Sequence, residues 1–457
     1  MKTLFNICPW LPGLFLLLAP FATVAEPPEE NVPVGSRFDS YAAPTETAPA
    51  PPPFPQQAEP TGALTLNDAV AAALSSNPAL AVFSWEVRAR EARAIQAGLF
   101  PNPTLSGEFE NIGGSGDRAG FAQTETTLGI SQRFQLAGQR TKRLRVSEQQ
   151  TALAEWDYES TRVGILTATT KAFMATLASQ SRLSLAAELA HLARATVTSV
   201  SAQVDAGAVP FVEKTRAEVV VLTADLERDR AERQLAADRI RLASSWGGRQ
   251  ALFSAVLGDL SGDISAPPAL DELKGRIDSN PDIARWRTAL AEREAAVVLE
   301  RARQIPDPTL SLGGRHFNDN GDAALVLNLS LPIPVFDRNQ GNTLAAVRQL
   351  SKARAEKASA VALAHSALAA RYEDLSSAFE QVVALRERAL PAAERAFKGT
   401  QDGYHQGLFR YLDVLDAQRS LFELRARQIE AQLSFHQARA DVERLINGPL
   451  YEGESDS

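Results

Sequence analysis

The chain has 457 residues, a formal net charge of −8 and a single cysteine, Cys8. The negative net charge argues against a nucleic-acid partner, because nucleic-acid-binding surfaces are basic. Cys8 precedes the first apolar run, so the rest of the chain has no thiol for a disulfide or a lipid anchor and must be held by packing, oligomerisation or both.

Residues 1–25 have the pattern of a signal peptide. Lys2 provides a charged start, the run from Leu11 to Ala19 is mostly apolar, and Thr23-Val24-Ala25 is a small-residue cleavage site. The apolar run is shorter than the roughly 20 residues of a membrane-spanning helix. We therefore expect the leader to be cleaved and the mature chain to be exported; the alternative is an uncleaved anchor.

A Pro-rich arm and a helix are expected next. Residues 26–62 are rich in Pro, Ala, Glu and Thr, which is typical of an extended or disordered arm. A first structural repeat is expected over 63–248. It begins with a helix from Leu64 to Leu99, with Thr65 as its cap, and Pro101 stops this helix.

The periodicity then changes from helix to strand. Small or apolar residues alternate with polar ones on both sides of a Gly-rich loop, which predicts a hairpin with strands at about 103–113 and 122–134. Beyond the hairpin the sequence lacks proline for a long stretch. We expect long helices at about 140–205 and 211–245, the first about 100 Å long at 1.5 Å per residue.

The second part of the chain follows the same plan. After an inter-repeat linker, 249–268, a second structural repeat is expected over 269–448, with a tail at 449–457. Its predicted elements are a helix at 269–304, strands at about 308–317 and 323–331, and long helices at about 341–402 and 408–446, the first interrupted at Pro391.

Two short motifs show that the halves are duplicates. Ser76-Asn77-Pro78 is echoed by Ser279-Asn280-Pro281, and the run from Pro101 to Ser106 is echoed by the run from Pro306 to Ser311. A spacing of about 200 residues is far longer than solenoid units of roughly 20–50 residues. The pattern indicates one structural half duplicated within the chain.

Four strands per chain imply an oligomer if the hairpins enter a membrane. A closed barrel needs about eight strands, and open strand edges are not tolerated in lipid. Several copies would then share one barrel, and three copies of four strands would supply twelve. Helices near 100 Å also require partners along their whole length, which a helical tube continuous with the barrel would provide.

At this point the chain resembles the TolC-type outer-membrane efflux factors, and within them the CzcC-type members that serve heavy-metal efflux. The segments that carry the resemblance are Pro101-Asn102-Pro103, the run from Glu110 to Gly116, Glu125-Thr126-Thr127-Leu128 and the run from Leu331 to Asn342. The resemblance implies a mainly α fold with a membrane β-barrel part: long coiled-coil-like helices form a periplasmic tube, and each chain of a homotrimer adds four strands to a twelve-stranded barrel. It also implies a place in the outer membrane of a Gram-negative bacterium.

The resemblance assigns a gate to the last helix. Asp413 and Asp416 match the family segment whose aspartates ring the periplasmic mouth, and three-fold symmetry would place six carboxylates around one axis. Such a ring concentrates cations and narrows the passage. The alternative is a solvated helix face near a turn.

The two turns between long helices resemble the tips that meet a periplasmic adaptor or a pump. Small and apolar residues suit docking onto a partner helix hairpin; the alternative is an ordinary helix–helix turn. The residues of the predicted docking tips are Gly207, Ala208, Val209, Pro210, Gly407, Leu408 and Phe409.

The sequence gives no reason to expect a metal site, a cofactor or an enzyme. None of the five histidines pairs with another His or with Cys at ligand spacing. No nucleophile, base and acid occur in a recognisable catalytic set. The five are His191, His316, His365, His405 and His436.

The leading hypothesis is therefore a passive exit duct for heavy-metal cations, connected through a periplasmic adaptor to an inner-membrane pump of the resistance-nodulation-division class. A second hypothesis is a duct for organic compounds or a secreted protein. A third, from another class, is a periplasmic coiled-coil structural protein that never enters a membrane.

Overall fold

The computed structural model describes residues 59–451. The predicted signal peptide, the predicted arm up to residue 58, and residues 452–457 of the predicted tail lie outside the described part.

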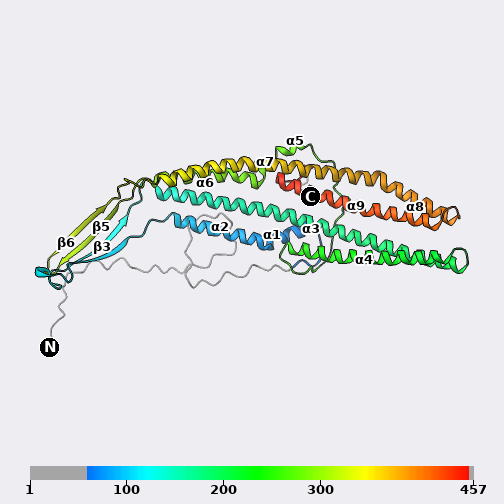
Figure 1. The fold of residues 1–457 in the computed structure, drawn as a ribbon, viewed down its shortest axis with the longest axis horizontal. Coiled ribbons are helices and arrows are strands. Elements are labelled where there is room, and N and C mark those ends of the chain that lie inside the picture. The colour runs from blue at the N-terminus through cyan, green and yellow to red at the C-terminus, as the bar shows by residue number, and fades with distance from the viewer. Residues whose placement is uncertain (1–58, 452–457) are drawn as a thin grey trace, which may run out of the picture. The chain divides into compact units, whose positions relative to one another are not determined.

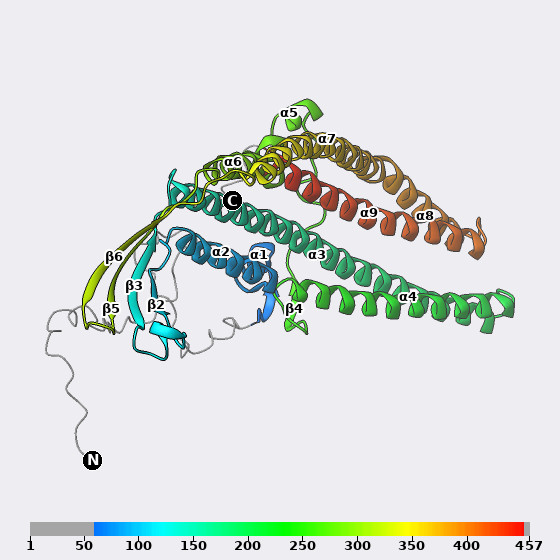
Figure 2. The same cartoon turned by 60° about the vertical axis from the view of Figure 1, so that its left-hand side comes forward.

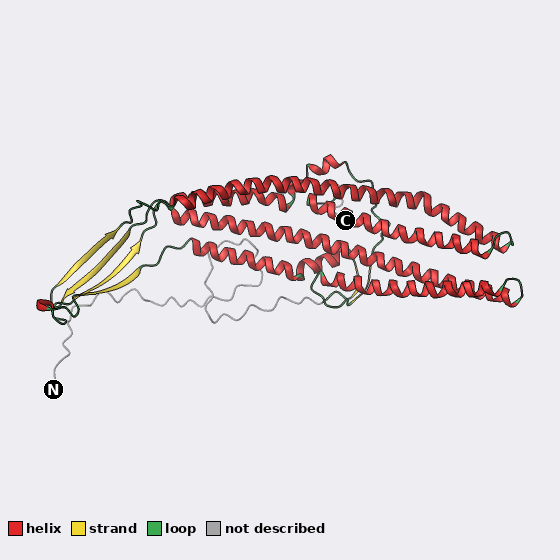
Figure 3. Ribbon diagram, in the orientation of Figure 1, coloured by secondary structure: helices red, strands yellow, loops and turns green. Residues whose placement is uncertain are grey.

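Long helices make up most of the described chain (Figures 1 and 3). The longest, α3, has 67 residues and contacts α2, α4, α6 and α9. None of the described helices combines the length and the apolarity that a membrane-spanning helix needs. The helices are α1 (Leu66–Ser76), α2 (Pro78–Ala97), α3 (Gln139–Asp205), α4 (Phe211–Ser244), α5 (Leu270–Lys274), α6 (Pro281–Ala302), α7 (Gln340–Ala384), α8 (Leu390–His405) and α9 (Tyr411–Ile446), with short turns η2 (Gly116–Arg118), η3 (Ile277–Ser279) and η4 (Leu385–Ala389).

The two hairpins form one antiparallel sheet. Its strands are β2 (Thr104–Glu110), β3 (Glu125–Arg133), β5 (Thr309–Phe317) and β6 (Ala323–Ser330), in the order β2-β3-β5-β6. Figure 2 shows the four strands side by side beyond one end of the helices. Within the chain β2 and β6 are therefore the free edges of the sheet.

The register gives the sheet one apolar and one polar face. Residues paired across antiparallel strands share a face, so alternation along each strand becomes continuous rows across the sheet. One apolar row consists of Leu105, Ile130, Leu312 and Leu327, all exposed in the single chain, and one polar row consists of Thr104, Ser131, Ser311 and Asn328.

Two glycines bring the central strands close together. Gly129 pairs with Gly313 on the polar face. A Cβ atom at Gly313 would lie 2.7 Å from the carbonyl oxygen of Leu128 and 3.0 Å from Cα of Gly129. The absence of side chains therefore permits this close approach of the two backbones.

Each helix that precedes a hairpin is interrupted, which corrects two predictions. The sequence predicted single helices over 64–99 and 269–304. In the structure Asn77 and Asn280 end one helical segment and cap the next: Oδ1 of Asn77 accepts from the amide of Ala79, and Oδ1 of Asn280 from that of Asp282, both at 2.8 Å. The proline that follows each asparagine occupies the first helical turn, where its missing N–H costs nothing.

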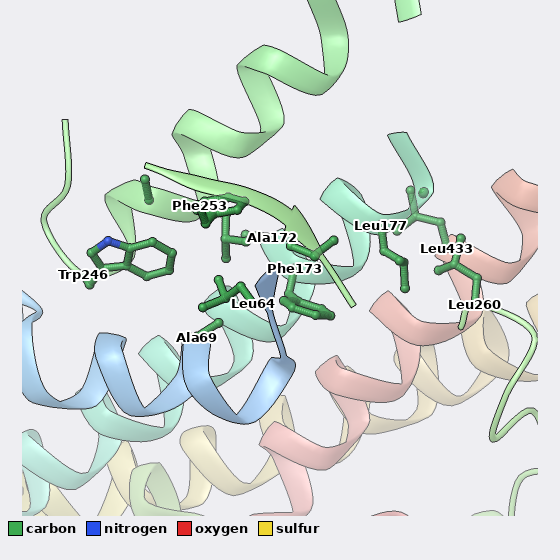
Figure 4. Close-up of a cluster of buried hydrophobic side chains, with 13 residues drawn as sticks. Leu64, Ala69, Ala172, Phe173, Leu177, Trp246, Phe253, Leu260 and Leu433 are labelled. Atoms are coloured by element: carbon green, nitrogen blue, oxygen red, sulfur yellow. The ribbon is translucent and has the colours of Figure 1, made fainter. Parts of the chain in front are cut away.

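The predicted linker 249–268 contains a strand that the sequence did not reveal. Strand β4 (Phe253–Val256) pairs in parallel with β1 (Gly62–Leu64). Around this pair lies a buried apolar cluster that joins α1, α3, α4 and α9; Figure 4 shows Phe173, Phe253 and Leu433 among its members. The cluster anchors both repeats at mid-length.

The sequence predicts an interruption at Pro391 within the helix over 341–402, and the structure has one immediately before this proline. The structure has α7, then a π-helical turn, η4, and then α8. Pro391 has no N–H to donate to the carbonyl of Glu387, and the wider turn of η4 accommodates the proline.

Candidate functional site

The two long helix pairs end in tips of the same construction. Tip 1 joins α3 to α4, and tip 2 joins α8 to α9. The amide of Ala208 donates to the carbonyl of Gln203, and the amide of Leu408 to that of Gly403, both at 2.8 Å. The glycines between them, Gly207 and Gly407, have φ of +69° and +73°. This is the Schellman motif, in which glycine takes the left-handed conformation.

The predicted docking residues of the two tips differ in the apolar side chains that they expose, although Phe211, which follows tip 1, is itself exposed. In tip 1 Gly207, Ala208 and Pro210 are exposed, while Val209 is half-buried and packs on a small cluster that includes Val200 and Ala217. In tip 2 Gly407, Leu408 and Phe409 are all exposed, Leu408 by 73% and Phe409 by 47%. The predicted docking residues thus form an exposed surface that is more apolar at tip 2.

The missing side chain of Gly403 makes room for Phe409. A Cβ atom at Gly403 would overlap the ring of Phe409, and Gly403 is buried. The ring of Phe409 therefore covers the last turn of α8, and this contact sets the direction of the ring at the tip.

Asp413 and Asp416 lie in the first turns of α9. Oδ2 of Asp413 accepts a 2.8 Å hydrogen bond from the amide of Arg410, so Asp413 also stabilises the helix N-terminus, where anions are favoured. Asp416 is exposed. The first turns of α4 instead carry Glu213 and Arg216, which form a salt bridge of 2.9 Å. In the described chain Asp413 and Asp416 form no such salt bridge, although Arg419 one turn further along α9 interacts electrostatically with Asp416.

Two tyrosines that the sequence analysis missed connect the tips. Oη of Tyr404 donates a 2.8 Å hydrogen bond to Oε1 of Gln203, and its ring lies 6.1 Å from that of Tyr411. Tyr411 is buried, and its hydroxyl has no hydrogen-bond partner among the described residues. Burial, with smaller contributions from Tyr404 and Glu213, raises the pKa of Tyr411 to about 12. The available signal was that two of the six tyrosines flank one tip.

The histidines whose side chains the structure describes do not form a metal site. Among residues 59–451 no group of three His, Cys, Asp or Glu side chains is placed to hold a metal ion. His436 is buried against the carbonyl of Leu260, at 3.0 Å from Nε2. Burial lowers the pKa of His436 and favours its neutral form.

Comparison with known proteins identifies the family to which this chain belongs. The model of the outer membrane efflux protein family matches residues 69–248 and 276–448. The chain is 33% identical over 396 residues to the cobalt-zinc-cadmium resistance protein CzcC of Cupriavidus metallidurans, covering 86% of this chain and 92% of that protein. It is 29% identical to the nickel-cobalt-cadmium resistance protein NccC of Alcaligenes xylosoxydans xylosoxydans, covering 62% of this chain and 63% of NccC.

A solved structure of CusC, described for its folding and transmembrane channel formation, superposes with a TM-score of 0.72 at 18% identity, covering 90% of this chain and 99% of CusC. At this identity the likeness shows the shared fold. The family match covers both repeats and the CzcC match nearly the whole chain. The chain therefore belongs to the outer membrane efflux protein family and acts in efflux at the outer membrane.

Proposed function

We propose that the protein is the outer-membrane exit duct of a tripartite efflux system that exports heavy-metal cations. The observation that carries the duct is the four-stranded sheet with one apolar and one polar face and two free edges, continuous with long helices. The resistance proteins CzcC and NccC, named for cobalt, zinc, cadmium and nickel, support the cargo.

Three copies would close the sheet. Free strand edges in lipid leave backbone N–H and C=O groups without partners, so β6 of one copy would pair with β2 of the next. Three copies of four strands give a twelve-stranded barrel with its apolar face toward lipid and its polar face toward the lumen.

The periplasmic mouth would be formed by the tips. Asp413 and Asp416 from three copies would place six carboxylates around the axis and favour cations in the passage. The proposal is supported by the absence of a salt bridge to either carboxylate within the described chain, in contrast to the Glu213–Arg216 pair of tip 1. Arg419 attracts Asp416 only over a longer distance. The alternative is that Asp413 acts only as a cap and Asp416 only as a solvated side chain.

A periplasmic adaptor would dock on the exposed tips, and an inner-membrane pump would provide the energy. The duct itself would be passive, with no enzymatic activity and no cofactor. Leu408 and Phe409 support docking at tip 2, because exposed apolar residues of this size gain most from a partner surface.

Conductance of purified trimers in planar bilayers tests the gate. The D413N/D416N variant removes both charges, while an Asn at 413 can still accept from the amide of Arg410. We expect a weaker preference for cations over anions. The matched control is D271N/E272Q on α5, which lies outside the long helices (Figure 1). Equal cation preference in the D413N/D416N variant and the wild type would rule out the charge ring but not the duct.

Metal tolerance tests the cargo. A strain without the gene should lose resistance to zinc, cobalt or cadmium and recover it with the wild-type gene. Loss of tolerance to organic compounds alone would favour the second duct reading. A mature chain that is monomeric and soluble without detergent would favour the coiled-coil structural protein.

A further inference from the structure

A buried carboxylate joins the two repeats where the sheet meets the helices. Oδ1 of Asp307 accepts from Nε2 of Gln139 and from the amide of Leu136, each at 3.0 Å. Oδ2 accepts from Nε and Nη2 of Arg133, each at 3.1 Å. Asp307 and Gln139 are 9% and 8% exposed. This junction fixes the start of β5 against the end of β3 and the start of α3.

The duplication supplies the same parts a second time. Pro101-Asn102-Pro103 precedes β2 as Pro306-Asp307-Pro308 precedes β5, so Asn102 corresponds to Asp307. Gln340 is the first residue of α7, as Gln139 is of α3. The residue before each glutamine is an N-cap in the left-handed conformation, Gly138 with φ of +63° and Asn339 with φ of +55°.

These second parts are not joined within the chain. Asn102 and Gln340 are both exposed, and they belong to the opposite free edges of the sheet, β2 and β6. Within the chain Oε1 of Gln340 accepts from the amide of Arg338 at 2.8 Å, and its Nε2 reaches the carbonyl of Phe336 at 3.2 Å.

The strand order of the sheet indicates that a second copy of the chain completes this junction. Because β3 pairs with β5 inside the chain, the corresponding pairing is β6 with the β2 strand of a second copy. We propose that Gln340 of one copy donates through Nε2 to Oδ1 of Asn102 of the next, repeating the bond between Gln139 and Asp307. The inference rests on the proposed shared barrel and assigns the contact that sets the register between copies.

The difference in charge between the two junctions fits this assignment. The carboxylate of Asp307 is balanced by Arg133. Arg133 lies six residues before Gln139, and the residue six before Gln340 is Pro334. The connection from β6 to α7 thus has no cation at the position of Arg133, its one Arg being Arg338 beside Gln340, and Asn102 is neutral. A buried carboxylate without a cation is costly, so an amide is the side chain that the junction between copies can tolerate.

Cross-linking in the outer membrane tests the contact. In a full-length chain with C8S, the N102C/Q340C pair treated with a short bismaleimide should give covalent dimers and trimers. The matched control N102C/K357C moves the second cysteine 17 residues along α7, about 25 Å at 1.5 Å per residue, and should give none. Trimers that form normally but do not cross-link through N102C/Q340C would overturn the junction and leave the duct intact; absence of trimers in the wild type would overturn the duct itself.

A double-mutant cycle provides a test without cysteines. N102D and Q340K should each lower the temperature at which the trimer dissociates in detergent, because each buries a charge without a partner. The N102D/Q340K double variant should recover much of the loss through a pair across the junction. Additive losses in the double variant would overturn the contact.

Discussion

Oη of Tyr404 donates a 2.8 Å hydrogen bond to Oε1 of Gln203, a residue 201 positions earlier in the chain. This bond joins α8 to α3 directly beside tips 1 and 2. Each tip belongs to a different repeat, so the bond restrains the movement of one helix hairpin relative to the other. The proposed periplasmic mouth would need this movement in order to open.

Removing this bond should loosen the mouth. In Y404F, Oε1 of Gln203 loses its hydrogen-bond donor, at a cost of about 1 kcal/mol, and we expect more frequent opening of single channels in planar bilayers. Y411F is the matched control, because the Tyr411 hydroxyl is buried without a hydrogen bond. Its removal should leave opening unchanged and stability equal or slightly higher. Equal opening in the two variants would contradict a role for the bond.

A methyl group at Gly403 should displace the ring of Phe409. G403A introduces an overlap at the tip, and we expect weaker binding of a periplasmic adaptor, measured by co-purification with the channel. G399A, one turn earlier on α8, has no atom within 4 Å of the added Cβ. It should bind the adaptor normally and gain about 1 kcal/mol of helix stability. Normal adaptor binding by G403A would show that docking does not depend on the position of the Phe409 ring.

The sequence predicted the features that arise from local patterns. Alternation in the hairpins and the proline-free run from Arg140 to Asp205 anticipated β2, β3 and α3, because strand and helix periods are written in neighbouring residues. The pairing of β1 with β4 was missed because both segments are short, with three and four residues, and the helices and strands of the whole first repeat separate them in the sequence. The interruptions at Asn77 and Asn280 have a visible Asn-Pro signal, which indicates the start of a helical stretch but does not show that another helical segment ends directly before it.

The candidate site was predictable only in part. Residue types and turn glycines placed the tips and the aspartates, since these lie within a few residues of one another. The capping bond of Asp413 depends on the backbone at Arg410, and the bond from Tyr404 to Gln203 depends on the packing of two distant helices. The contact proposed for Asn102 can be inferred only once the hydrogen bonds of Asp307, the corresponding residue of the second repeat, are known.

Acidification should destabilise the folded chain through His436. Its pKa is lowered below the ordinary 6.5 by burial, while Arg439 adds to the lowering and Asp263 and Glu443 oppose it. The unfolded chain therefore binds the proton first, and the stabilisation present above pH 6.5 is lost as pH falls toward the lower pKa of the folded state.

Thermal unfolding of the detergent-solubilised protein at pH 7.5 and pH 5.5 measures this effect. We expect a lower midpoint at pH 5.5, and a smaller difference in H436Q, whose side chain does not titrate. H191Q controls for loss of an exposed histidine. The same pH dependence in H436Q and the wild type would assign the effect to other groups.

Two adjacent glycines on opposite faces of β5 offer a test of the close approach between β3 and β5. In G313A the new methyl group would press on the carbonyl oxygen of Leu128, 2.7 Å away, and on Gly129. In G314A the methyl group meets no atom within 4 Å. Because backbone contacts cannot move aside as a flexible side chain can, G313A should destabilise the sheet by roughly 1–3 kcal/mol. It should also lower the temperature at which trimers dissociate in detergent.

G314A is the matched control. Its trimers should dissociate at the wild-type temperature, since strand alternation points its methyl group to the apolar face. If both substitutions shift trimer dissociation equally, the effect would be a general cost of losing glycine in a strand, and close approach of β3 and β5 would not be what the assembled sheet requires.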